Sequence, residues 1–242
     1  MNIVIPMAGL GSRFANAGYK APKPLIDVAG KPMIVRVIEN LRQPGVKFIL
    51  LARKEHIESS RELVAQIEGE FNAIFVSIDR LTEGTACTVL YARSYLNPGE
   101  EVVIANSDQI IDDCFGRYLT DARSRDLDGS ILTFRDIELS PKWSFAKVDS
   151  KGFVTEVQEK KPISEFATVG VYYFRRADVL IDGIIQMIIE NDRVNNEFYT
   201  CPVYNYLIRQ GKKVGIYNID QSQMHGIGTP EDLNAFMKLI QN

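Results

Sequence analysis

The stretch NIVIPMAGLGSRF, residues 2–14, joins a short apolar run to a glycine-rich loop that carries one arginine. The run Asn2–Pro6 is typical of a buried strand. Glycines in the following loop let the backbone approach a phosphate and point its N–H groups at it. Phe14 stands where a dinucleotide-binding loop has its third glycine, and no Walker-type Gly-Lys-Ser/Thr follows. The alternative is a flexible strand-to-helix turn. The loop residues of interest are Ala8, Gly9, Gly11, Ser12 and Arg13, whose guanidinium suits phosphate oxygens.

Buried strands and helices alternate along the first half of the chain. Strands are expected at Asn2–Pro6, Lys47–Leu51, Ala73–Ile78 and Val102–Ala105. Helices are expected at Met33–Leu41, His56–Glu68 and Thr85–Tyr95. This order predicts an α/β fold with a largely parallel sheet that is covered on both faces.

The pattern changes after about Asp113, where strands become more frequent than helices. Strands are expected at Ser130–Arg135, Ser144–Val148, Phe153–Val157, Val169–Phe174 and Lys213–Asn218. Helices are expected at Ala177–Glu190 and Glu197–Arg209, and a last helix begins near Thr229, which can cap it. We therefore expect mixed or antiparallel strands appended to the parallel part. Because no linker, repeat or low-complexity run interrupts the chain, one domain over residues 1–242 is the better interpretation.

Composition and charge exclude several classes of protein. Of the 242 residues, 45% are hydrophobic and 24% charged, as in soluble domains that bury a core without disulfides. The net charge of -3 gives no field that would draw the protein to nucleic acid or to an anionic membrane. The first residues, MNIVIPMAGLGS, lack the basic region and the apolar length of a signal peptide, and no stretch reaches the ~20 apolar residues of a membrane span, so we expect neither. Three separated cysteines and two histidines argue against zinc and fit a reducing compartment, so we expect a cytoplasmic protein.

Lys23 stands between two prolines, Pro22 and Pro24, shortly after the glycine loop. The prolines fix the backbone, so the ammonium group has a defined position at low entropic cost. A fixed cation beside a glycine loop is what a pentavalent phosphorus centre requires. The alternative is a solvated lysine in a proline-rich surface loop.

Gly-x-Gly-x-Arg-Phe at residues 9–14, followed by Pro-Lys-Pro-Leu at residues 22–25, resembles the opening of the sugar-phosphate nucleotidyltransferase family. The resemblance implies a Rossmann-like, glycosyltransferase-A-type fold and an in-line displacement at the α-phosphorus of a nucleoside triphosphate. It implies that the loop wraps the triphosphate while Arg13 and Lys23 grip its phosphates. It also divides the domain into a nucleotide-binding half, to about residue 113, and an acceptor-binding half from about residue 114.

Further segments follow in the order that the family shows. Glu83, Gly84, Thr85 and Ala86 are similar to its base-recognition turn, for which a plain helix N-cap is the alternative. Asp108 follows the expected strand Val102–Ala105 and takes the place of the aspartate that holds Mg²⁺, for which Mn²⁺ can substitute. Without the resemblance it would be an ordinary turn residue. The resemblance assigns an acceptor pocket to Glu159, Lys160 (or Lys161 in its place), Gly170, Glu197 and Tyr199.

The closing Gly-Thr-Pro element at residues 228–230 departs from the family's pattern. Many relatives carry a second metal-binding aspartate two residues before that glycine, where this chain has Gly226. The neighbouring His225 is one substitute, although a lone histidine is more often structural. Otherwise metal binding rests on Asp108, the triphosphate and water.

The short chain and its loop motifs look most like bacterial cytidylyltransferases of capsule and surface-polysaccharide pathways, which implies CTP as the nucleotide. The acceptor would be a small phosphorylated metabolite: a sugar phosphate, phosphocholine, or a phosphorylated amino-acid amide such as phosphoglutamine. A metal-dependent glycosyltransferase on the same fold is an alternative, but Asn106-Ser107-Asp108 has only the last carboxylate of an Asp-x-Asp motif. A non-catalytic nucleotide-binding regulator would explain Gly226 but not the presence of Arg13 and Lys23. The sequence leaves formation of a homodimer open.

Overall fold

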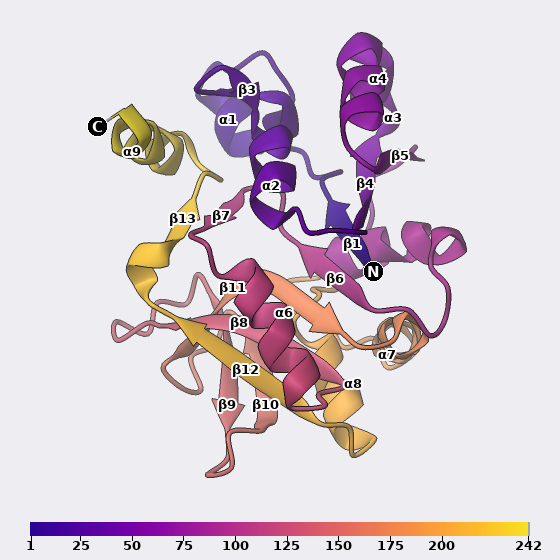
Figure 1. Cartoon of the computed structure of the whole chain (residues 1–242), viewed down its shortest axis with the longest axis vertical. Helices are drawn as coiled ribbons and strands as arrows, with labels where there is room; N and C mark the ends of the chain where they lie inside the picture. The colour runs from indigo at the N-terminus through magenta and orange to yellow at the C-terminus, as the bar shows by residue number, and fades with distance from the viewer. Residues whose placement is uncertain (242) are drawn as a thin grey trace.

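The strands of the first half form the parallel part of one central sheet (Figure 1). In the computed structural model, which describes residues 1–241, this sheet has nine strands. Strand β1 (Asn2–Pro6) lies between β4 (Lys47–Arg53) and β6 (Val102–Ala105) and runs parallel to both. Strand β5 (Ala73–Ile78) continues the parallel order beyond β4. The predicted parallel sheet is confirmed.

Strand β11 (Phe166–Phe174) joins the parallel part to the strands of the second half. It is antiparallel to β8 (Gly129–Arg135) along one edge, and along the other edge to β6 and, at Ala167, to β9 (Ser144–Val148). Strand β10 (Val154–Glu159) pairs with β9, and β12 (Val214–Ile219) runs parallel to β8. The sheet is therefore mixed with a parallel core, as the sequence predicts.

Helices and small strands surround this sheet (Figure 1). The helices are α1 (Ser12–Asn16), α2 (Met33–Leu41), α3 (Lys54–Ser59), α4 (Arg61–Glu70), α5 (Thr85–Val89), α6 (Phe115–Ser124), α7 (Ala177–Ile189), α8 (Val203–Arg209) and α9 (Pro230–Gln241). Short 3₁₀ turns lie at Lys23–Leu25, Leu90–Tyr95 and Gln221–Gln223. Two small sheets have two antiparallel strands each. One pairs β2 (Asp27–Val28) with β3 (Lys31–Pro32), and the other pairs β7 (Gln109–Ile111) with β13 (Met224–Gly226), which lies far along the chain.

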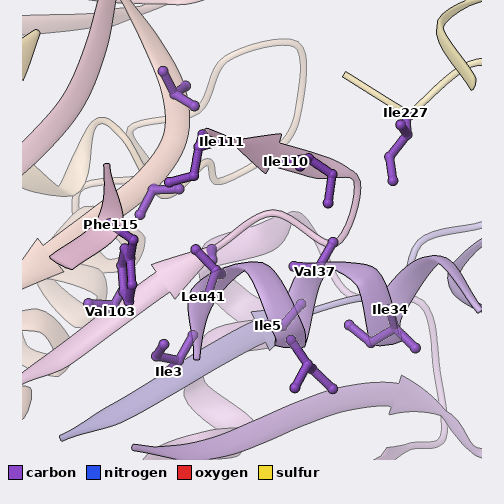
Figure 2. Close-up of a cluster of buried hydrophobic side chains, with 14 of the residues drawn as sticks. Ile3, Ile5, Ile34, Val37, Leu41, Val103, Ile110, Ile111, Phe115 and Ile227 are labelled. Carbon is purple, nitrogen blue, oxygen red and sulfur yellow. The ribbon is translucent and has the colours of Figure 1, made fainter. Parts of the chain in front are cut away.

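The core lies on both faces of the sheet because successive side chains of a strand point to opposite faces. On β1, Ile3 and Ile5 pack into one buried cluster while Val4 packs into the other. Figure 2 shows the first cluster, where the apolar face of α2 lies over Ile3 and Ile5. Ile227, from the segment after β13, is fully buried in the same cluster. The last part of the chain thus contributes to the same core as the first strand.

Three predicted helices differ in the structure. The helix expected at Thr85–Tyr95 is α-helical only to Val89 and continues as a 3₁₀ turn from Leu90. The helix expected at His56–Glu68 is two helices, α3 and α4, because Ser60 leaves the helical conformation at φ -132° and ψ 36°. The helix expected from Glu197 begins only at Val203. Asn195 and Asn196 both have positive φ and form a tight turn, which prevents an earlier helical start. The segment Glu197–Pro202 is therefore a loop that lies against the cleft described below.

Two further predictions concern the last helix and membrane-spanning segments. Thr229 caps α9, since its Oγ1 accepts a hydrogen bond of 3.1 Å from the backbone N–H of Asp232. Over residues 1–241, every helix is too short or too polar to span a bilayer.

Candidate active site

A continuous cleft lies at the carboxyl ends of β1 and β6, where loops from several elements meet. One part, of about 470 Å³, is lined by the glycine loop, Lys23, Thr85 and the segment Asn106–Asp108. A second part, of about 790 Å³, extends over β9, β10 and β13. Both parts share Arg13, Thr85, Asn106, Asp108 and Gly228. In open α/β sheets, ligands bind in the crevice outside the carboxyl ends of the strands. A groove of similar volume between α2 and α6 has no glycine loop.

Lys23 and Asp108 form an ion pair in the middle of this cleft, although they lie 85 residues apart. Their side chains are 22% and 23% exposed, so water screens the pair only partly. Gly11 has φ 63°, and a Cβ at this position would lie 3.0 Å from the Cβ of Lys23. The glycine thus satisfies both a left-handed backbone and a close approach to the lysine. Gly9, Gly11, Ser12 and Arg13 all line the cleft, whereas Ala8 is buried beneath it.

The turn Glu83–Ala86 is held by the loop before α8. The backbone N–H of Phe198 donates to the carbonyl of Glu83 at 2.8 Å, and the N–H of Ala86 donates to the carbonyl of Phe198 at 3.0 Å. A side chain on Gly84 would overlap the Phe198 backbone. These two hydrogen bonds occupy part of the backbone that was expected to bind the base. Of the four turn residues, only Thr85 lines the cleft.

The acceptor side of the cleft contains a buried carboxyl group. Glu159 is 8% exposed and accepts a hydrogen bond from the Ser144 hydroxyl. Burial raises the pKa of the Glu159 carboxyl above its ordinary value, and the hydrogen bond from Ser144 and the charge of Lys160 act in the opposite direction. Glu159 lines the larger part of the cleft, so a ligand hydroxyl or amine could bond to its carboxyl group in a poorly hydrated site.

Lys160 and Tyr199 meet beside Glu159. The Lys160 ammonium donates to the Tyr199 hydroxyl at 2.6 Å and lies 4.5 Å from the ring centroid. Burial raises the pKa of Tyr199, so its hydroxyl stays protonated. Lys161 is exposed and does not line the cleft, so the structure brings Lys160 into the pocket and leaves its alternative outside.

Gly170 and Glu197 occupy different parts of the cleft. Gly170 lines the larger part, and a side chain there would collide with the Asn106 amide, since its φ is 89° and β11 passes close to β6. Glu197 lines the smaller part, on the side of the glycine loop, and its carboxylate also reaches Tyr199, where it adds to the raised pKa of the hydroxyl. Lys142 and Trp143, which the sequence analysis did not single out, also line the larger part, with the Lys142 ammonium 4.6 Å from the Trp143 ring centroid. They precede β9 in a loop with no motif that could have marked them.

His225 does not replace the missing aspartate. Its Nε2 lies 2.9 Å from an Asp112 carboxylate oxygen, and its ring packs against Phe236 of α9 at 5.7 Å. It is not among the residues that line the cleft, because successive side chains of β13 alternate in direction. Gly226, its neighbour, does line the cleft.

The donor set at Asp108 fits a hard divalent cation. Mg²⁺ is usually held by one or two carboxylates together with substrate phosphates and water, so a complete protein cage is not required. Within residues 1–241, no three His, Cys, Asp or Glu side chains converge on a metal-binding position. Asp108 faces the space enclosed by the glycine loop, Arg13 and Lys23, where a triphosphate would supply the remaining oxygen ligands.

Curated proteins similar to this chain are named as nucleotidyltransferases. The chain is 25% identical to the low-salt glycan biosynthesis nucleotidyltransferase Agl11 of Haloferax volcanii, over 99% of this chain and 66% of that protein. It is 28% identical to the mannose-1-phosphate guanylyltransferase catalytic subunit beta of Dictyostelium discoideum, over 72% of this chain and 49% of that protein. The chain thus spans about half to two thirds of the length of these relatives.

Solved structures show the same fold. A nucleoside-diphosphate-sugar pyrophosphorylase from Vibrio cholerae RC9 superposes with a TM-score of 0.82 at 25% identity, covering 98% of this chain and 99% of that one. The inositol-1-phosphate CTP transferase from T. maritima superposes with a TM-score of 0.75 at 14% identity, covering 99% and 94%. The family described as nucleotidyl transferase matches residues 3–242, nearly the whole sequence. The chain therefore belongs to the nucleotidyl transferase family.

Proposed function

We propose that this protein transfers a nucleoside monophosphate, with CMP favoured, from a nucleoside triphosphate to a small phosphorylated metabolite and releases pyrophosphate. The observation that carries the proposal is the meeting of Arg13, Lys23 and Asp108 in one cleft at the carboxyl ends of β1 and β6. Family membership supports the same reaction class. Residues 1–113 supply most of the nucleotide side of the cleft, and residues from 114 onward supply most of the acceptor side.

The chemistry asks for charge neutralisation more than for proton transfer. A phosphate oxygen of the acceptor attacks the α-phosphorus, a new P–O bond forms, and the bond to the β-phosphate oxygen breaks with its electron pair leaving on pyrophosphate. The attacking oxygen is already anionic, so no strong general base is needed. Arg13 and the loop N–H groups would stabilise the pyrophosphate, and Lys23 the α-phosphate. A cation held by Asp108 would neutralise charge on the phosphate oxygens.

The second part of the cleft supports a phosphorylated acceptor. Lys160 offers an ammonium group close to where the acceptor phosphate must enter, which would offset repulsion between two polyanions. Glu159 and Tyr199 offer hydrogen-bonding groups for the remainder of the acceptor. This combination suits sugar phosphates, phosphocholine and phosphorylated amino-acid amides, and a role in capsule or surface-polysaccharide synthesis belongs to the same proposal.

The preference for CTP rests mainly on the resemblance to short cytidylyltransferases, because the turn Glu83–Ala86 brings only Thr85 to the cleft. Cytosine presents an amino group where uracil presents a carbonyl, so a site built for one base leaves a buried group unpaired with the other. Such a mismatch corresponds to about 1–3 kcal/mol, or roughly 5- to 150-fold in selectivity. One relative is named a mannose-1-phosphate guanylyltransferase, so GTP must be compared with CTP in the test.

A pyrophosphate-release assay tests both levels of the proposal. Four nucleotides, CTP, UTP, ATP and GTP, are each mixed with Mg²⁺ and with glucose 1-phosphate, mannose 1-phosphate, phosphocholine or phosphoglutamine. We expect the largest kcat/KM with CTP and one of these acceptors. Better use of UTP or GTP would overturn the CTP assignment alone, whereas no acceptor-dependent pyrophosphate with any pair would overturn the proposed reaction.

A further inference from the structure

The antiparallel pair β7–β13 leaves an open space on the wall of the cleft at Gly226. Gly226 lies directly opposite Gln109, so the side chain of Gln109 and the missing side chain of Gly226 share one face. A Cβ built on Gly226 would meet only the carboxylate of Asp232, whose Oδ2 would lie 3.9 Å away. Gly226, Gln109 and Asp232 all line the larger part of the cleft, together with Asp108.

Asp232 belongs to the first turn of α9, where an acid would ordinarily only favour the positive end of the helix dipole. Glu231 occupies the same turn, but of the two acids only Asp232 lines the cleft. The backbone N–H of Asp232 donates a hydrogen bond to the Thr229 hydroxyl. Among residues 1–241, the Asp232 carboxylate itself has no hydrogen bond and no ion pair. A carboxylate in this position is free to bind a cation.

Gln109 supplies the second and independent observation. Its side chain is nine-tenths buried, at 8% exposure, and within the described chain its Nε2 has no hydrogen-bond partner. A buried amide is normally paired, so an unpaired one that lines a cavity points to a ligand atom. The group lies immediately after Asp108 in the sequence, on the strand that faces Gly226.

We propose that Asp232 is the second protein carboxylate of the divalent-cation site at Asp108, taking the place that a side chain at position 226 would otherwise fill. The Gln109 amide would bond an oxygen of the same assembly, either a cation-bound water or a phosphate oxygen. Mg²⁺ and Mn²⁺ are the chemical class of ligand, because carboxylate, amide and phosphate oxygens are hard donors. The inference rests on the proposed function only for the use of the cation in nucleotidyl transfer.

Binding of Mn²⁺ tests the inference without any acceptor. Free Mn²⁺ is titrated by its electron paramagnetic resonance signal in wild type, Asp232→Asn, Glu231→Gln and the double variant Asp232→Asn with Gly226→Asp. We expect Asp232→Asn to raise the Kd for Mn²⁺ by roughly 10- to 100-fold. Glu231→Gln, on the same turn, should leave the Kd unchanged. Gly226→Asp should restore most of the affinity, because Gly226 has open space and no positive φ.

Two results would overturn this assignment. One is wild-type Mn²⁺ affinity in Asp232→Asn. The other is a loss that also appears in Glu231→Gln or that Gly226→Asp does not restore, because the effect would then belong to the first turn of α9. Thermal melting followed by circular dichroism confirms that each variant is folded. Failure of the proposed function would appear instead in the wild-type pyrophosphate assay, so the two failures are distinguishable.

Discussion

The ion pair between Lys23 and Asp108 should have opposite effects on metal binding and on turnover. In the ligand-free protein the Lys23 ammonium is paired with the Asp108 carboxylate, so a metal cation must compete with Lys23 for that carboxylate. Lys23→Met removes the charge and retains the length of the side chain. We therefore expect Lys23→Met to bind Mn²⁺ more tightly in the absence of nucleotide, while it turns over more slowly.

The size of the first effect follows from the exposure of the pair. Two unit charges about 4 Å apart attract by about 4 kcal/mol at an effective dielectric constant near 20. Both side chains are about one fifth exposed, so water and salt screen part of the attraction between them. Hydration of the Lys23 ammonium offsets a further part of that attraction when a cation displaces it from Asp108. A net coupling of about 1–3 kcal/mol corresponds to a Kd for Mn²⁺ that is roughly 5- to 150-fold lower in Lys23→Met.

The second effect of Lys23→Met, a loss of turnover, is larger than the gain in Mn²⁺ affinity. A cation that acts mainly on the transition state contributes roughly 10²- to 10⁴-fold to turnover, so kcat should fall by that factor. Mn²⁺ titration by electron paramagnetic resonance and pyrophosphate release measure the two quantities. Lys20→Met is the matched control, because Lys20 is exposed and outside the cleft, and it should change neither. Equal or weaker Mn²⁺ binding in Lys23→Met would refute the competition, and near-normal turnover would refute the catalytic role.

Two further predictions concern the walls of the cleft. Because the pKa of Glu159 is raised in the folded state, its contribution to stability is present below the unfolded pKa of about 4.3 and is lost as the pH rises through the raised value. The melting temperature of Glu159→Gln relative to wild type should therefore increase between about pH 4 and about pH 8, and a constant difference would contradict the burial argument. Gly228→Ala should lower kcat by roughly 10- to 100-fold, because the new Cβ would overlap the Asp108 carboxylate. Gly99→Ala, where nothing lies within 4 Å, is the control, and equal kcat in both variants would show that the Asp108 position is tolerant.

The parallel part of the fold and the meeting of its loops could be predicted from the sequence. Strand β1 has the predicted limits, Asn2–Pro6. Short buried strands that alternate with helices along the sequence predict a parallel sheet around it. Carboxyl ends of adjacent parallel strands lie at one edge of a sheet. That geometry brings Asp108, after β6, to the glycine loop after β1.

Other features depend on contacts that no local pattern encodes. The break at Ser60 and the late start of α8 are set by backbone conformations that a helical period does not reveal. Asp232 resembled an ordinary acid of a helical first turn, and its place beside Gly226 follows only from the packing of α9 against β13. Lys142 and Trp143 line the cleft from a loop before β9 that carries none of the recognised motifs, so no spacing rule could have marked them.

The two ends of the described chain build opposite walls of one cleft, and this has a consequence for synthesis on the ribosome. Residues 9–24 emerge well before Gly226, Gly228 and Asp232, so the cleft is complete only when synthesis has reached the first turn of α9. Strand β6 likewise remains an unpaired edge until Phe166–Phe174 arrives as β11. A nascent chain with its first strands already in place would thus lack a finished site, and the proposed transfer could not begin before the first turn of α9 has been made.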